Sequence, residues 1–322
     1  MKTLYIIGNG FDLAHELPTR YGDFHEWLDE HRDIHSQAYE FIDSIDGLTN
    51  GVEFWNEFEK ALGAIDGEEY FKHIIEEYKE TQDEDDWSAQ SAAVYAGIEF
   101  FKKDNYQDLL DAFGEWACDI EVDEDEVEIK YPQLMNDKED YFFTFNYTPT
   151  LEKIYHIPEE NIKHIHGDYT EKTEIVVGHA TEYGDLIDKM NKIDDDQLPT
   201  DVGDSVNKMI EMLNMSKKDT GRIISENYDY FRNLRELRIK RIVVIGHSYG
   251  KVDSPYFSMI KDNCPRAQWE MTHFKGDMID QAKEMAQELG ICAIFPELSL
   301  LQSPCYRMLT ALRLFFTCLI GK

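Results

Sequence analysis

The sequence is poor in basic residues. It has 32 Lys and Arg residues against 65 Asp and Glu residues, which gives a formal net charge of -33. Such a surface repels phosphate backbones, so we expect no broad nucleic-acid-binding face. The acidic runs DEDD at 83–86 and EVDEDEVE at 121–128 are typical of solvated helix faces and loops.

The cysteines also lack the spacing that is typical of a metal site. The five cysteines form no C-x-x-C pair, which argues against a zinc ribbon or a disulfide framework: Cys118, Cys264, Cys292, Cys305 and Cys318. His164 and His166 share one face of a predicted strand, but we see no nearby carboxylate to complete a ligand set, and no metal is expected. The first apolar run begins at Leu4, so we expect no secretory signal and a cytoplasmic location.

Long uninterrupted apolar runs are absent. The C-terminal segment CYRMLTALRLFFTCLIGK, 305–322, is apolar, but Arg307 and Arg313 interrupt it and it is short for a membrane span. We expect it to be a buried or partner-covered helix, and we do not expect membrane association.

The first glycine motif lacks a third glycine. Leu4 to Ile7 predict a buried strand, and Gly8 and Gly10 end it before a helix begins near Phe11. Glycines at such a turn let backbone N–H groups approach an anion, although a tight strand-to-helix turn alone also selects them. The dinucleotide fingerprint G-x-G-x-x-G requires glycine where Leu13 stands, so a nicotinamide dehydrogenase is disfavoured.

Further apolar runs predict strands within 141–148, 162–167, 174–180, 241–248 and 267–274, and helical patterns separate several of them. This alternation predicts an α/β fold with a doubly wound, mostly parallel Rossmann-like sheet, whose ligand crevice lies at the carboxyl ends of the strands. Residues 21–136 are rich in aromatics at helical spacing, such as Trp55, Phe58 and Leu62. We therefore expect a nucleotide-binding α/β domain at 1–20 and 137–296, a helical insertion at 21–136 and an apolar tail at 297–322.

Small or polar residues follow four of these predicted strands: Gly8 to Gly10, Asn146 with Thr148, His166 with Gly167, and Gly246 with Ser248. Because the carboxyl ends of parallel strands meet at one edge of a sheet, we expect these residues to face one ligand.

The motifs GNGFD, FTFNYT, HIHG and GHSYGKVDSPYF, in this order and with a helical insertion after the first, resemble the phage abortive-infection family AbiH through about Tyr256. The same order is similar to the wider SIR2-like group of NAD-binding domains, in which a glycine loop and T-x-N, H-G and G-x-S motifs surround the dinucleotide. The resemblance implies an antiphage NAD glycohydrolase that cleaves the nicotinamide–ribose bond of NAD. It also implies a phage-derived trigger or partner protein, while self-association stays open.

The resemblance also implies roles for single residues. His166 would be the catalytic base, and Asn146 would hold the nicotinamide riboside end. Gly8 and Gly10 would approach the pyrophosphate, and Gly246 and Ser248 would bind phosphate or ribose. The other implied binding residues are Asn9, Phe11, Asp12, Thr148, Gly167, His247 and Asp253. An acid often follows the asparagine in the SIR2-like group where Thr148 stands here, and the zinc-binding cysteines of deacylases are missing, so NAD hydrolysis is favoured over deacylation.

Two other interpretations stay open. GHSYG matches the G-x-S-x-G nucleophile elbow of α/β-hydrolases, with Ser248 as nucleophile, Asp253 or Asp262 as acid and His273 as base. That interpretation leaves GNGFD and HIHG without a role. The third interpretation is a nucleotide-binding sensor without catalytic activity.

Overall fold

The computed structural model describes residues 2–45, 58–65, 103–136, 139–167, 175–181, 200–274 and 278–303. The strands are β1 (Thr3–Ile7), β2 (Tyr141–Thr144), β3 (Ile162–His164), β4 (Arg241–Ile245), β5 (Gln268–Met271) and β6 (Ala293–Ile294). The α-helices are α1 (Gly10–Ala14), α2 (Tyr21–Glu30), α3 (Ser36–Ile45), α4 (Phe58–Leu62), α7 (Lys103–Asp119), α8 (Thr150–Lys153), α10 (Thr200–Met215), α11 (Thr220–Glu226), α12 (Tyr228–Leu237), α13 (Ser254–Asn263), α14 (Met278–Leu289) and α15 (Leu298–Leu301). Short 3-10 helices are η2 (Pro132–Asn136), η3 (Glu159–Asn161) and η5 (Lys251–Asp253).

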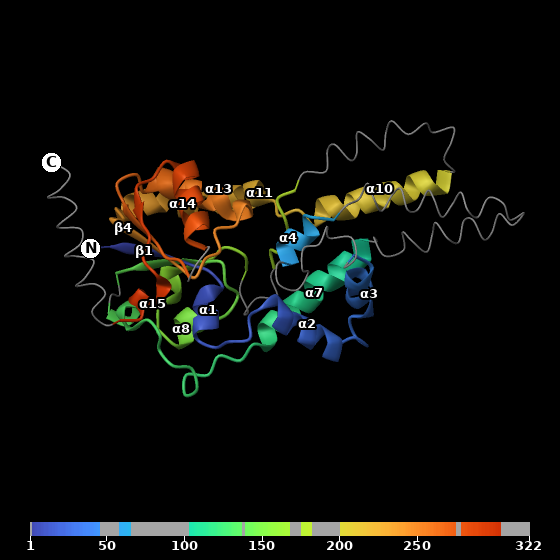
Figure 1. Cartoon of the computed structure of the whole chain (residues 1–322), viewed down its shortest axis with the longest axis horizontal. Coiled ribbons are helices and arrows are strands. Elements are labelled where there is room, and N and C mark those ends of the chain that lie inside the picture. Colours follow the sequence, from blue (N-terminus) through green and yellow to red (C-terminus); the bar gives the residue numbers. More distant parts are fainter. Residues whose placement is uncertain are drawn as a thin grey trace, which may run out of the picture. The chain divides into compact units, whose positions relative to one another are not determined.

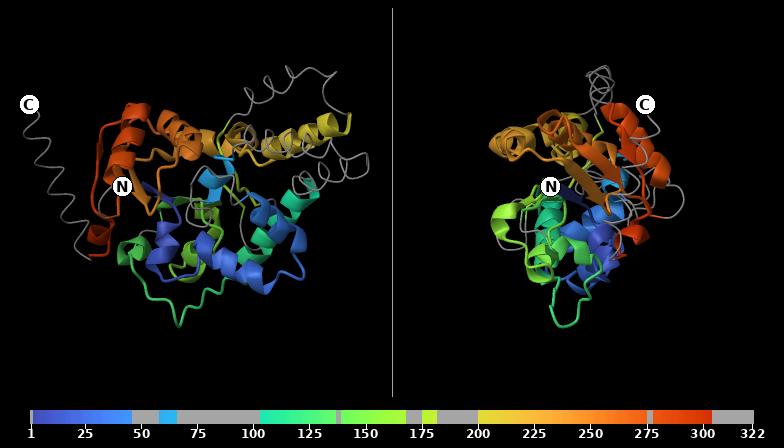
Figure 2. Two further views of the ribbon diagram at one scale, coloured as in Figure 1. Left: turned by 45° about the vertical axis from the view of Figure 1, so that its right-hand side comes forward. Right: turned by 90° about the vertical axis from the view of Figure 1, so that its left-hand side faces the viewer.

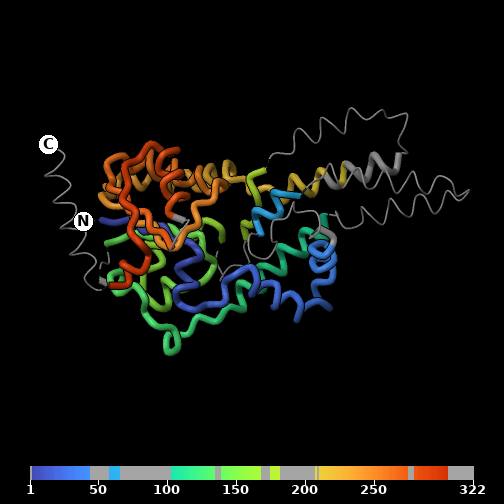
Figure 3. Tube along the Cα trace, in the orientation of Figure 1, coloured from blue at the N-terminus to red at the C-terminus, as the bar shows by residue number. Residues whose placement is uncertain are grey.

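The chain divides into two compact units. The α/β unit comprises Met1–Thr19, Ala117–Glu174 and Asp219–Lys322, and the helical unit comprises Arg20–Trp116 and Ile175–Lys218. Figure 3 traces the path of the chain through the described residues. The helical unit thus has a second segment, Ile175–Lys218, that the sequence analysis placed in the α/β domain.

The α/β unit is built on one six-stranded sheet in the order β3-β2-β1-β4-β5-β6. Every neighbouring pair is parallel; Leu4 of β1, for example, lies opposite Tyr141 of β2 and Ile242 of β4. Strands from the two ends of the sequence therefore lie side by side at the centre (Figure 1). The predicted α/β fold with a parallel sheet is confirmed.

Helices cover both faces of this sheet because alternate residues of its central strands point to opposite sides. On one face, Tyr5, Ile7 and Val243 join a core with buried side chains of α1, α8 and α15. On the other, the Phe143 ring lies 5.9 Å from Phe231 of α12 and 6.1 Å from Tyr256 of α13, measured between ring centroids. Figure 2 shows this layering from two further sides.

One predicted strand, 174–180, does not enter the sheet. Residues 175–181 belong to the helical unit, where His179 forms an isolated bridge with Lys217. The His179 N–H donates to Ser216 O at 3.1 Å, and the Lys218 N–H donates to His179 O at 2.9 Å. The backbone of this run is thus hydrogen-bonded to the chain after α10. The prediction of a sheet strand at 174–180 is therefore wrong.

An aromatic core holds the helical unit together. The Phe24 ring of α2 lies 5.0 Å from Phe113 and 5.4 Å from Trp116, both on α7, between ring centroids. Phe58 and Leu62 of α4 are buried, while Trp55, predicted to share their face, lies outside the described residues.

Some predictions from the sequence concern the C-terminal region or residues outside the described ranges. Leu298 and Leu301 of α15 are buried in the α/β core, whereas the apolar segment 305–322 and the acidic run 83–86 lie outside the described residues. Within the described ranges, no helix combines the length and apolar character that a bilayer crossing requires.

Candidate functional site

Two glycine-containing loops meet at the carboxyl ends of β1 and β4. The Gly8 N–H donates to Ile245 O at 2.9 Å, and the Gly10 N–H donates to Gly246 O at 2.8 Å. A Cβ on Gly8 would lie 2.7 Å from His247 Cα, and a Cβ on Gly10 would lie 2.8 Å from Gly246 O. Gly246 has φ +68°, and a Cβ there would lie 2.3 Å from the Phe11 nitrogen. These glycines are therefore required by the contact between the loops, and the Gly8 and Gly10 N–H groups already have carbonyl acceptors.

The two loops flank the point where the strand order reverses. From β1 the sheet continues through β2 and β3 on one side and through β4, β5 and β6 on the other. Ligands of open α/β sheets bind outside the carboxyl ends of the strands at such a point. Asn9 and Ser248 are exposed here, and Asn9 Nδ2 also donates to Thr19 O at 2.7 Å. These two side chains are thus the accessible polar groups of the paired loops.

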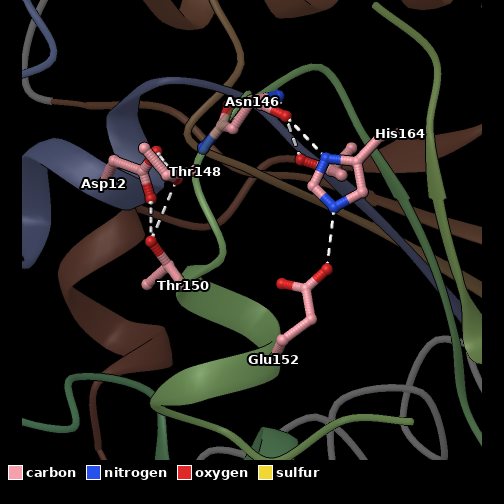
Figure 4. Close-up of polar contacts among 7 residues, drawn as sticks. Asp12, Asn146, Thr148, Thr150, Glu152 and His164 are labelled. Carbon is pink, nitrogen blue, oxygen red and sulfur yellow. Dashed lines mark hydrogen bonds and ion pairs between the residues drawn. The ribbon is translucent and has the colours of Figure 1, made fainter. Parts of the chain in front are cut away.

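A buried carboxylate lies beneath the first loop. Asp12 accepts hydrogen bonds from Thr148 Oγ1 at 2.5 Å and from Thr150 Oγ1 at 2.8 Å, as Figure 4 shows. Burial raises the pKa of Asp12 to about 6, although the two hydroxyls, the Asn146 amide and the charge of His164 act in the opposite direction. The carboxylate therefore titrates close to neutral pH while its two oxygens are held by β2-loop threonines.

Asn146 follows β2 and lies between this carboxylate and a histidine (Figure 4). Its N–H donates to Thr144 Oγ1 at 3.0 Å, and its carbonyl lies 2.9 Å from His164 Nδ1. The other ring nitrogen of His164, Nε2, lies 2.9 Å from Glu152 Oε1. Because both ring nitrogens face acceptors, this geometry suits the doubly protonated ring of His164.

The side-chain amide nitrogen of Asn146 can donate a further hydrogen bond. Asn146 is 6 % exposed, and its amide is near enough to Asp12 to lower the pKa of that carboxyl, but within the described parts of the chain its Nδ2 makes no hydrogen bond of good geometry. A buried amide nitrogen without an acceptor is costly, so it indicates a position where a ligand atom or water accepts a hydrogen bond.

Two histidines and one aspartate form a second buried group, which we call the His–Asp cluster: His166, His247 and Asp253. His247 Nε2 lies 3.3 Å from Asp253 Oδ2, and His166 Nε2 lies 3.9 Å from Asp253 Oδ1. The three residues are 4 %, 4 % and 7 % exposed. The ring of Phe145, next to Asn146 in the sequence, lies 5.1 Å from His166 and 4.6 Å from His247, between centroids. A carboxylate thus stands between two imidazoles from different strand ends.

A comparison with models of protein families identifies the family of this chain. The family model described as bacteriophage abortive infection AbiH matches residues 4–273, a range that contains both glycine loops, Asn146 and the His–Asp cluster. The chain belongs to the AbiH family. Its function is therefore bacteriophage abortive infection, as the description of the family states. Neither a search of curated proteins nor a search of solved structures found a match.

Most residues predicted for the site of this AbiH protein lie at the carboxyl ends of β1, β2, β3 and β4. Phe11 is an exception, because its ring is 1 % exposed and stacks on Tyr131 at 5.3 Å in the core of the α/β unit. Gly167 follows His166 with φ +88°, a conformation that favours glycine. The Phe11 ring thus serves the core, while the polar residues surround the strand ends.

Two buried histidine pairings were not found from the sequence. Glu152 supplies the carboxylate beside His164 that the sequence analysis did not find, although within the described residues no group of three or more His, Cys, Asp or Glu side chains is arranged to hold a metal ion. The second missed residue is His15, whose pKa is lowered by burial. Its Nδ1 lies 2.7 Å from Phe11 O and its Nε2 lies 2.7 Å from the Tyr155 hydroxyl, as expected for a neutral structural histidine.

The geometry of this AbiH protein does not reproduce the nucleophile elbow of a hydrolase. The residue with positive φ in GHSYG, apart from Gly246, is Tyr249 and not Ser248. Asp253 faces His166 and His247, and the Nδ1 of His273 lies 2.7 Å from the neighbouring Phe274 O. Within the described residues no hydrogen bond joins Ser248 to a histidine, so the serine lacks the base that a nucleophile needs.

Proposed function

We propose that this AbiH protein is an NAD glycohydrolase of the cytoplasm, which a phage-derived trigger switches on during infection. The reaction is hydrolysis of the nicotinamide–ribose bond, in which NAD and water give nicotinamide, ADP-ribose and a proton. The observation that carries the proposal is the buried His–Asp cluster beside the reversal of strand order. The order β3-β2-β1-β4-β5-β6 supports it further, since dinucleotide-binding sheets of the Rossmann type share this order.

The chemistry requires a base more than an acid. Cleavage of the glycosidic bond develops oxocarbenium character on the ribose, and nicotinamide leaves from a substrate nitrogen that already carries positive charge. A histidine that accepts the proton of the attacking water contributes roughly 10²- to 10⁴-fold. We assign this role to His166, because it follows β3 at the carboxyl edge of the sheet and its Nε2 faces the Asp253 carboxylate. The Asp253 carboxylate would then stabilise the positive charge that forms on His166.

Substrate binding is assigned to groups that remain able to accept or donate. Asn9 and Ser248 are exposed on either side of the strand-order reversal, and Asn146 Nδ2 is a buried donor. We do not assign the pyrophosphate to the N–H groups of Gly8 and Gly10, because both already donate to carbonyls. The pyrophosphate would instead meet the surface of the paired loops.

The test measures nicotinamide and NAD in bacteria that express the protein and are exposed to a panel of phages. Wild type should deplete NAD and release nicotinamide during an infection that triggers defence. The His166→Ala variant should reduce nicotinamide release by at least about 100-fold at equal soluble protein. Retained depletion by folded His166→Ala protein would refute the base assignment.

A matched control is His15, a buried histidine of the α/β unit outside the His–Asp cluster. His15→Gln loses the Tyr155 contact and should lower the melting temperature while leaving nicotinamide release per folded molecule unchanged. Protection from phage without loss of NAD would favour a sensor without catalytic activity. Labelling of Ser248 by a serine-directed phosphonate, together with loss of protection in Ser248→Ala, would favour the hydrolase.

A further inference from the structure

The imidazole of His247 is engaged at both nitrogens within its own loop. Its Nδ1 accepts a hydrogen bond from the Tyr249 N–H at 2.8 Å, so Nδ1 carries no proton. The proton of the neutral ring is then on Nε2, which lies 3.3 Å from Asp253 Oδ2. The Tyr249 N–H therefore fixes one tautomer of the neutral His247 ring and leaves the protonated nitrogen beside the carboxylate.

The backbone of Tyr249 supplies that fixed donor. Tyr249 has φ +60°, a conformation that is costly for a residue with a bulky side chain. Its side chain is 4 % exposed, and its hydroxyl donates to Thr272 O at 2.5 Å. Thr272 is itself tied to β4, because its Oγ1 donates to Val244 O at 2.7 Å. The unusual backbone of Tyr249 is thus held in place from the end of the neighbouring strand β5.

The other oxygen of Asp253 faces the second histidine. Asp253 Oδ1 lies 3.9 Å from His166 Nε2, which is longer than a hydrogen bond but close enough for strong attraction to a charged ring in a buried setting. This arrangement places His166 Nε2 toward Asp253, where the carboxylate stabilises the positive charge that the ring gains when it takes a proton.

We propose that His247 is a positioning residue and not a ligand-binding one: fixed by the Tyr249 N–H, it holds Asp253 toward His166. This inference rests on the proposed function, because it concerns the base of that reaction. It also assigns a role to His247 and Tyr249, the two residues that flank Ser248 in GHSYG. A residue that acts through Asp253 should change the rate of the chemical step and not the affinity for NAD.

Two substitutions of His247 separate its hydrogen bond with the Tyr249 N–H from its contact with Asp253. In His247→Gln the side-chain NH2 can reach the place of Nε2 and donate to Asp253, whereas in His247→Asn the shorter side chain can accept from Tyr249 but does not reach Asp253. We expect His247→Gln to keep kcat within about tenfold of wild type and His247→Asn to lose a further tenfold or more, with KM unchanged in both. A rise in KM without loss of kcat in either variant would show that His247 binds NAD and would overturn the inference.

A second measurement does not depend on turnover. Nitrogen NMR of the full-length protein should show the neutral ring of His247 as the Nε2–H tautomer, and the Tyr249 amide proton should move upfield when His247 is replaced by Ala. A His247 ring with its proton on Nδ1 would overturn the inference while leaving the proposed function standing. Absence of nicotinamide release from wild type in triggered cells would instead overturn the proposed function, and the positioning role with it, even if the tautomer is as expected.

Discussion

The buried carboxyl of Asp12 gives this protein a stability that depends on pH in an unusual direction. Its pKa is raised from 3.8 to about 6 because burial disfavours the charged form. The folded protein therefore holds this proton more tightly than the unfolded chain. The corresponding contribution to stability is fully present below pH 3.8 and is lost as the pH rises through 6. Replacement by asparagine, in Asp12→Asn, removes the titration.

The expected magnitude follows from the difference in pKa. The full difference of roughly two units corresponds to about 3 kcal/mol, since one unit is about 1.4 kcal/mol. Between about pH 8 and pH 5 the wild type should gain about 1.4 kcal/mol over Asp12→Asn, because pH 5 lies roughly one unit below the folded-state pKa. This range also stays above the isoelectric point of about 4.5, where the acidic protein is soluble.

The assay is urea denaturation of wild type and Asp12→Asn at several pH values in that range. The difference between the two free energies of unfolding isolates Asp12, because the other titrating groups are common to both proteins. Asp262→Asn is the control: the Asp262 side chain is 65 % exposed on α13, and its difference from wild type should not vary with pH beyond a few tenths of a kcal/mol. A difference for Asp12→Asn that is flat, or that grows toward alkaline pH, would show that burial does not govern this carboxyl.

Three further predictions concern contacts within the α/β unit. Gly246→Ala should destabilise the protein by at least about 2 kcal/mol in thermal unfolding, because the new Cβ meets the Phe11 nitrogen and φ is positive; an unchanged melting temperature would contradict the loop contact. Arg241→Met should cost about 3–5 kcal/mol, because it leaves the buried Glu270 carboxylate without its bidentate partner, and adding Glu270→Leu should restore most of that loss; equal stability of single and double variants would argue against the pair. Thr148→Val removes a donor to Asp12 and should move the pH dependence of stability to higher pH; a shift to lower pH would contradict the assigned hydrogen bond.

Much of the sheet could be predicted because its central strands, β1 and β4, are buried on both faces. After the first strand, four of the five predicted runs contain an observed strand: β2, β3, β4 and β5. The run 174–180 has the same apolar character but pairs with the segment after α10, and periodicity alone does not distinguish a sheet strand from a buried extended segment. The residue pattern thus predicts burial better than it predicts the partner of a strand.

The site was predicted in its residue types more than in its contacts. The glycines of GNGFD were assigned to phosphate, whereas the structure shows that Gly10 is needed where it approaches Gly246, 236 residues later in the sequence by their numbers. Likewise, the bonds of Asp12 to Thr148 and Thr150 join α1 to the segment that leads from β2 into α8, which no local pattern reveals. His164 with Glu152 was within reach, because a histidine on a strand and a glutamate on the preceding helix are close enough in sequence to be tested as a pair.

The central position of β1 has a consequence for the order in which the protein is made. Its two hydrogen-bonding neighbours, β2 and β4, begin at Tyr141 and Arg241. While a ribosome is still translating the first segment of the helical unit, Arg20–Trp116, β1 therefore has neither partner, and the loop of Gly8 and Gly10 has nothing to close against. The His–Asp cluster is complete only after Asp253 has been added to the chain. A nascent chain thus spends most of its synthesis without the group of residues that we assign to catalysis, and a truncated product of a failed translation lacks that group altogether.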